Sequence, residues 1–116
     1  MRHLSNQKKF GRTRNQRNAL LNGLIRSLIE REKIVTTTVK AKGIKPQVEQ
    51  IITKGKNKNL STIRYLHSLL DSKNAKKVYE ILSPRYQERT GGYTKILRIP
   101  PRKSDGAEMA IIEFIK

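Results

Sequence analysis

A pair of adjacent glycines among basic side chains is the part of the chain body best suited to binding a phosphate group. Gly91-Gly92 can bring bare backbone amides close to a phosphate oxygen. The basic side chains around the pair are Arg85, Arg89 and Lys95. The segment is not a nucleotide-binding P-loop, because it lacks the Gly-Lys-Ser/Thr ending, and it does not match the dinucleotide fingerprint. We therefore treat it as a candidate phosphate contact.

Two tyrosines flank this glycine pair and leave two interpretations open. Tyr86 and Tyr93 offer ring faces on which bases can stack, or hydroxyl groups that contact sugar and phosphate. Alternatively, the glycines turn the chain into a strand while both tyrosines pack in the core. The spacing alone favours neither interpretation.

A second candidate is a basic arm at the N-terminus, residues 1–13. Residues 1–29 contain no acidic side chain, and the basic ones up to residue 18 are Arg2, Lys8, Lys9, Arg12, Arg14 and Arg17. Because so little apolar surface is present, the arm alone should be disordered and should order on a phosphate backbone. Other expected RNA contacts in the arm are His3, Phe10, Gly11 and Thr13. A solubility tail is less favoured because such tails usually mix signs or are acidic. A transit peptide is less favoured because the arm runs directly into helix-capping residues.

Further basic side chains are spread over the rest of the chain. Lys40, Lys42 and Lys45 lie near an expected helix start, where exposed amides also favour anions, although a plain solvated helix face is an alternative. The remaining candidates are Arg26, off the apolar stripe of its helix, Lys56 and Lys58 in a turn, and Arg102 and Lys103 in a loop.

The residues that could support catalysis or bind a metal are few. The chain has no Cys, which excludes disulfides, thiolate zinc sites and a cysteine nucleophile. His3 and His67 lie far apart in sequence, and His67 is better explained as a structural residue of a helix. Glu108 and Glu113 are five residues apart and would face opposite sides of a strand. We therefore expect no enzyme, no metal, no cofactor and no small-molecule substrate.

Composition supports an anionic polymer as partner. The 116 residues include 26 Lys+Arg against 9 Asp+Glu, a formal net charge of +17, with 35% hydrophobic residues. That charge repels itself unless something anionic neutralises it. No apolar run approaches the roughly 20 residues that a membrane helix needs, and no signal-peptide pattern begins the chain. We expect a soluble intracellular protein with an anionic polymer as partner.

The hydrophobic pattern predicts the elements that must position these residues. A first helix is expected over about 14–32, with a Thr13–Gln16 capping box. A second helix should end at about Lys54, and Pro46 within it implies either a kink or a later start. Two more helices are expected over about 60–70 and 75–82, the last ended by Ser83-Pro84. Strands are expected over 34–39, 93–99 and 109–115, the last two as an antiparallel pair.

This order predicts an α+β fold. We expect a small mixed three-stranded sheet packed against about four helices, formed by residues 14–116 as a single domain, with an extended basic N-terminal arm over residues 1–13.

The chain resembles the bacterial-type large-subunit ribosomal protein L seventeen family over nearly its whole length. The matching motifs are Phe10-Gly11-Arg12-Thr13, Gln16-Arg17, Ala19-Leu20-Leu21, Thr36-Thr37, Lys40-Ala41-Lys42, Val48-Glu49, Ile52-Thr53 and, most specifically, Arg85-Tyr86, Glu88-Arg89, Gly91-Gly92-Tyr93-Thr94-Lys95-Ile96-Leu97, Pro101-Arg102, Asp105-Gly106-Ala107 and Met109-Ala110-Ile111-Ile112-Glu113. The sequence departs from the family pattern at Glu108, Ser104, Gly43 and the first four residues.

The resemblance implies a structural component of the large ribosomal subunit, in the cytoplasm. It implies binding to large-subunit ribosomal RNA near the polypeptide exit tunnel, next to neighbouring ribosomal proteins, without catalysis or a membrane. Two competing hypotheses are a nucleoid protein that coats DNA and an enzyme that acts on RNA through His67 or Glu113.

Overall fold

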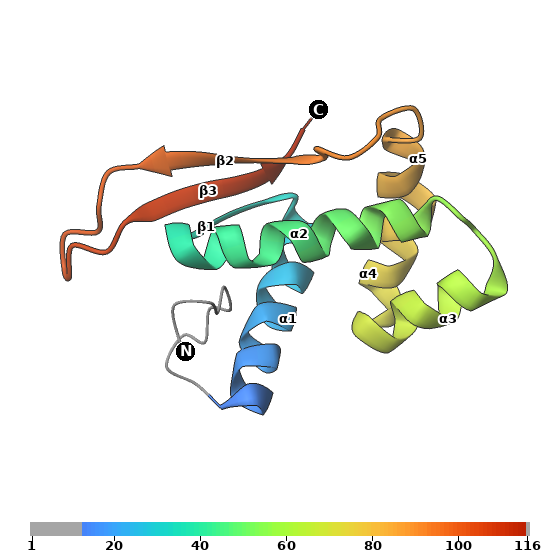
Figure 1. Cartoon of the computed structure of the whole chain (residues 1–116), viewed down its shortest axis with the longest axis horizontal. Coiled ribbons are helices and arrows are strands. Elements are labelled where there is room, and N and C mark those ends of the chain that lie inside the picture. The colour runs from blue at the N-terminus through green and yellow to red at the C-terminus, as the bar shows by residue number, and fades with distance from the viewer. Residues whose placement is uncertain (1–12, 116) are drawn as a thin grey trace, which may run out of the picture.

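The computed structural model describes residues 13–115, beginning at the cap of helix α1 (Arg14–Arg31) (Figure 1). The Thr13 hydroxyl accepts a hydrogen bond from the Gln16 amide, and the Gln16 side chain accepts one from the Thr13 amide, both at 3.3 Å. The predicted capping box is therefore confirmed. The apolar stripe buries Leu21, Ile25, Leu28 and Ile29. The helix ends at Glu32, which adopts a left-handed conformation with φ of 64°.

Strand β1 (Lys33–Thr37) leads directly into helix α2 (Thr38–Gly55). The strand ends two residues earlier than predicted because Thr37 serves as the N-cap of α2, its hydroxyl accepting from the Lys40 amide at 3.4 Å. Pro46 lies inside α2, so of the two alternatives, a kink or a later start, the later start is wrong. The missing N–H of Pro46 costs α2 one hydrogen bond, at a residue that is itself exposed.

The third and fourth predicted helices are present, but the fourth continues past its predicted end. Asn59 caps α3 (Leu60–Leu69), and α4 (Ser72–Lys77) runs into a π-helical segment, η2 (Val78–Leu82), and then α5 (Ser83–Arg85). The Ser83 amide donates to the carbonyl of Val78, five residues back. This wider turn accommodates the ring of Pro84, which would clash inside an ordinary α-helix. The prediction that Ser83-Pro84 ends the helix was therefore wrong.

The sheet confirms the predicted α+β class but is antiparallel throughout. Strand β3 (Met109–Phe114) lies between β1 and β2 (Thr94–Ile99) and pairs antiparallel with both. The expected mixed sheet is wrong because β1 and β2, the two strands separated by the helices, are not neighbours. The predicted antiparallel pairing of the last two strands is confirmed.

One face of the sheet packs against α2 and forms the core with α1. Figure 1 shows α2 lying along the sheet, with α1 crossing beneath it and α3 to α5 gathered at one end. The fully buried residues at the centre include Leu28, Ile29, Ile44, Ile52 and Ile112. The end of α2 is pinned to α5 by the buried Ser83 hydroxyl, which donates to the carbonyl of Ile52 at 2.9 Å.

Two glycines provide a matched test of this packing. A Cβ at Gly55 would lie 2.3 Å from the Ser83 Oγ and 2.9 Å from Val78 Cγ1, whereas one at Gly23, in α1, would meet no atom within 4 Å. We expect Gly55→Ala to lower the free energy of unfolding by about 1–3 kcal/mol through overpacking. Gly23→Ala should raise it by about 0.5–1 kcal/mol. Urea unfolding of both variants measures this, and equal effects would contradict the proposed contact.

Candidate nucleic-acid interface

The predicted arm contacts fall mostly outside the described part of the chain. These are Arg2, His3, Lys8, Lys9, Phe10, Gly11 and Arg12. Thr13 is described, and its hydroxyl is occupied by the capping hydrogen bond to Gln16. Arg14 and Arg17 lie in the first turn of α1, and Arg26, farther along the same helix, donates to the carbonyl of Leu69 at 3.5 Å. Arg14 and Arg17 therefore place basic side chains at the start of α1, where the arm joins the body.

The glycine pair forms a tight loop between α5 and β2. Gly91 and Gly92 have φ values of 78° and 63°, a left-handed conformation that glycine adopts without steric cost. The Arg89 guanidinium donates to the Gly92 carbonyl at 3.2 Å, and the Gly92 amide donates to the Glu49 carboxylate at 3.2 Å. The Gly92 amide therefore already donates to a carboxylate of the protein and is not free to bind a phosphate.

Both tyrosines near the glycine pair pack in the core. Tyr86 and Tyr93 are 4% and 1% exposed, and their ring centroids lie 5.3 Å apart. The Tyr86 hydroxyl donates to the carbonyl of Ile115, while the Tyr93 hydroxyl lies 3.2 Å from Thr53 Oγ1. Of the two interpretations left open by the sequence, the packed one is therefore correct. Tyr93 has no ring face available for a base, and this corrects its expected role as a stacking residue.

Glu49 holds the glycine loop and strand β2 against α2. Its carboxylate accepts hydrogen bonds from Lys45 Nζ at 3.0 Å, Thr94 Oγ1 at 3.1 Å and the Gly92 amide. Burial alone would raise the pKa of the Glu49 carboxyl, but the hydrogen bonds from Lys45, Gly92 and Thr94 outweigh burial and lower this pKa below 4.5. Lys45 also donates to the carbonyl of Thr94 at 3.0 Å, so it joins the same network.

Three lysines at the end of α2 lie over tyrosine rings. We call Lys54, Lys56 and Lys58 the turn cluster. Their ammonium groups lie 4.1, 4.7 and 5.8 Å from the ring centroids of Tyr65, Tyr93 and Tyr79, respectively. Lys56 also donates to the carbonyl of Arg89, which brings the glycine loop to the same end of the molecule. These cation–π contacts restrict the side chains while leaving the ammonium groups near solvent.

The opposite end of α2 carries a second group of basic residues. Lys40 and Lys42 lie in its first turns, and the Thr38 amide donates to the carbonyl of Glu108 at 2.9 Å, which ties this end to the β2–β3 loop. That loop carries Arg102 and Lys103, both exposed. Figure 1 shows the start of α2 and the β2–β3 loop at the end of the molecule opposite α3. We call Lys40, Lys42, Arg102 and Lys103 the loop-end cluster.

Several predicted contacts have carboxylate partners within the chain. Arg85 bonds to Glu32, and this hydrogen bond is the main cause that lowers the pKa of the Glu32 carboxyl. Lys95 lies 3.3 Å from Glu113. Arg102 makes a two-pronged contact with Asp105, at 3.0 and 2.9 Å. These side chains thus also stabilise the fold, whereas Lys40, Lys42, Lys56, Lys58, Arg89 and Lys103 have no carboxylate within 4.0 Å among residues 13–115.

Sequence reasoning did not assign a role to Glu49. Its spacing of four residues from Lys45 in an expected helix could have indicated the first ion pair. The contacts to Gly92 and Thr94 join residues more than forty positions apart, and no local pattern indicates them.

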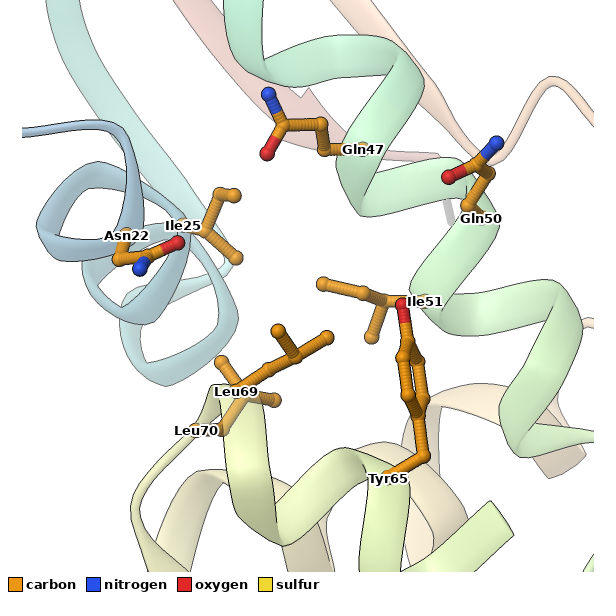
Figure 2. Close-up of a pocket in the computed structure, with 8 residues that line it drawn as sticks. All are labelled: Asn22, Ile25, Gln47, Gln50, Ile51, Tyr65, Leu69 and Leu70. Atoms are coloured by element: carbon orange, nitrogen blue, oxygen red, sulfur yellow. The ribbon is translucent and has the colours of Figure 1, made fainter. Parts of the chain in front are cut away.

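A small pocket lies between α1, α2 and α3 (Figure 2). Its volume is about 90 Å³, with Ile25, Ile51 and Leu70 in its apolar wall. Asn22, Gln47 and Gln50 place amide groups around it. Ligand pockets typically measure roughly 300–1,000 Å³, so we assign it no small-molecule ligand.

No group of three or more His, Asp or Glu side chains among residues 13–115 is placed to hold a metal ion. None of the helices in that part of the chain has both the length and the apolar character needed to cross a bilayer.

The Glu49 network makes a pH-dependent prediction. Because the pKa of this carboxyl is lower in the folded chain, its stabilisation is complete above the unfolded pKa and is lost as pH falls through the folded pKa. We expect Glu49→Gln to lower the free energy of unfolding by about 1–3 kcal/mol at pH 7. The difference from the unsubstituted chain should shrink once the pH falls below 4.5.

The matched control for this prediction is Glu88→Gln. Glu88 is exposed and precedes the same glycine loop, so its substitution removes the same charge. It should change the unfolding free energy little across the pH range. Equal destabilisation by the two substitutions would show that net charge, and not the network, is responsible.

Comparison with known proteins gives a family. The family model described as ribosomal protein L17 matches residues 20–115. The large ribosomal subunit protein bL17 of Pelagibacter ubique is 48% identical over 116 residues, covering 99% of this chain and 80% of its own length. The protein of the same name from a Hydrogenobaculum species is 46% identical over 118 residues, covering both chains fully. The one from an Exiguobacterium species is 46% identical over 113 residues, covering 92% of this chain and 97% of its own. The chain therefore belongs to the ribosomal protein L17 family, whose members are structural components of the ribosome and not enzymes.

Proposed function

We propose that this protein is a structural constituent of the large ribosomal subunit that binds large-subunit ribosomal RNA near the polypeptide exit tunnel, in the cytoplasm. Its relatives are named as proteins of the large ribosomal subunit, and the family resemblance implies the position near the tunnel. The basic arm and the basic clusters of the body supply the RNA contacts, and the protein performs no chemistry of its own.

One observation carries the RNA-binding part of this proposal. Basic side chains without a carboxylate within 4.0 Å among residues 13–115 lie at several separate places, among them the turn cluster with Arg89, the lysines of the loop-end cluster (Lys40, Lys42 and Lys103), and Arg14 and Arg17 at the start of α1. A single pocket for one small anion would gather them at one point. Their separation suits a folded RNA that surrounds the protein and whose phosphates they neutralise.

Purified large subunits provide the direct test. The protein should be present at one copy per subunit, should resist moderate salt and should contact RNA at both ends of α2 near the exit tunnel. A sub-stoichiometric amount, or binding to cellular duplex DNA without sedimentation with large subunits, would overturn the proposal in favour of a nucleoid protein. RNA contacts mapped far from the exit tunnel would overturn only the proposed position of the protein within the subunit.

The body contacts can be tested with matched lysine substitutions. We expect Lys42→Gln combined with Lys58→Gln to weaken RNA binding and to reduce the slope of log affinity against log salt by about 0.7–0.9 for each lost phosphate contact. The control is Lys73→Gln with Lys76→Gln in α4, which removes the same charge outside both clusters; Lys73 already pairs with Glu30 at 3.3 Å. An equal reduction in both double variants would mean that only net charge matters.

The arm can be tested by deleting residues 1–12. Deletion should weaken RNA binding and flatten its salt dependence, again by about 0.7–0.9 in slope for each lost contact. The thermal unfolding of the isolated body should barely change, because the described core is built from later residues. A salt slope equal to that of the full chain would show that the arm does not bind phosphates.

A further inference from the structure

The face of the sheet that points away from α2 carries two rows of mostly aliphatic side chains. Antiparallel register aligns Val35, Ile111 and Leu97 in one row across the three strands. The next row consists of Thr37, Met109 and Ile99. Alternate residues of a strand point to opposite faces, so these six side chains share one surface, which we call the outer sheet face.

The outer sheet face is apolar yet uncovered among the described residues. Val35 and Leu97 are 58% and 46% exposed, whereas Ile34, Ala110 and Ile112 on the opposite face are buried. Beyond the aliphatic rows lies one charged row, in which Glu113 stands between Lys33 at 3.9 Å and Lys95 at 3.3 Å. Contiguous exposed apolar patches of this kind mark sites of protein contact.

The chemistry of this face does not suit RNA. Its two aliphatic rows contain no aromatic ring on which a base can stack and no basic side chain to pair with a phosphate. Phosphates or base edges in contact with aliphatic groups would lose their hydrogen bonds to water and gain none from the protein. The uncovered face therefore differs in kind from the basic clusters.

Neither the N-terminal arm nor a second copy of this chain is well suited to cover the outer sheet face. Residues 1–12 can span at most about 40 Å, and they join the chain at the end of α1 farthest from β1. To reach the sheet they would first have to run back along the length of α1, which takes up about 27 Å of that span. The arm also offers only Leu4 and Phe10 as sizeable apolar side chains after Met1. A second copy would bring together two chains that each carry a net charge of +17.

Resting on the ribosomal role proposed above, we propose that the outer sheet face is a docking surface for another protein of the large ribosomal subunit. That partner presents aliphatic side chains to the rows of Val35 and Met109. It also places a carboxylate beside Lys33 and Lys95, because these two exposed ammonium groups share the single carboxylate of Glu113 and leave an excess positive charge.

Site-specific photo-crosslinking in intact large subunits tests this surface. A photoreactive amino acid is placed at position 35 or 97 and, as control, at Leu60, an aliphatic position on α3 that is at least as exposed as either. Large subunits purified from cells that express each chain are irradiated, and mass spectrometry identifies what is attached. We expect positions 35 and 97, but not 60, to attach to the same protein of the large subunit.

Three outcomes would overturn the docking surface. They are attachment to RNA, attachment to a second copy of this chain, and no attachment at either position in subunits that hold the chain at one copy each. A chain absent from large subunits would overturn the proposed function and this inference together, so the two failures are distinguishable.

A substitution that keeps charge and strand propensity provides an independent measure. Val35→Thr with Leu97→Thr should lower incorporation into subunits about tenfold in competition with the unsubstituted chain, as expected when central interface side chains are truncated. Leu60→Thr should compete equally. The thermal unfolding and the RNA affinity of each isolated protein are measured alongside. A double variant that stays folded, binds RNA normally and still competes equally would contradict the inference.

Discussion

Mutual repulsion among 26 basic side chains is the constraint on which the rest of this structure depends. Several of the few carboxylates join elements that are distant in sequence. Glu32, at the end of α1, holds Arg85 and lies 3.3 Å from Lys77. Glu113 holds side chains of both neighbouring strands, and Glu49 ties β2 to α2. The acidic residues thus relieve repulsion at the junctions of the fold and leave the ends of α2 strongly basic.

Much of the fold could be predicted because its signals are local. The capping box at Thr13, the aliphatic stripes of the first three helices and the pairing of the last two strands all follow from short-range patterns. The sheet order could not be predicted, since a strand inserted between β1 and β2 is a long-range choice. The π-helical turn before Pro84 was not predicted. It avoids a clash of the proline ring with the preceding turn through a change in hydrogen bonding that residue types alone do not indicate.

The candidate interface was predictable as a set of charges but not as an arrangement. The sequence identified the basic residues, yet it could not distinguish those held by carboxylates, such as Arg85, from those left without one, such as Lys58. Tyr93 illustrates the same difficulty. Its spacing beside two glycines is compatible with stacking on a base, and only its burial against Tyr86 and its contact with Thr53 place it in the core.

Helix α2 contributes to the core and also fixes the distance between the two basic clusters at its ends. Its 18 residues make a rod of about 27 Å, and a basic cluster lies at each end. Side chains along the rod pack under the sheet, and Ser83 and Glu49 tie it to its neighbours, so the two ends cannot approach one another. If RNA phosphates bind at both ends as proposed, α2 would hold them at a fixed separation of about its own length. The protein would then act as a rigid spacer between two segments of RNA.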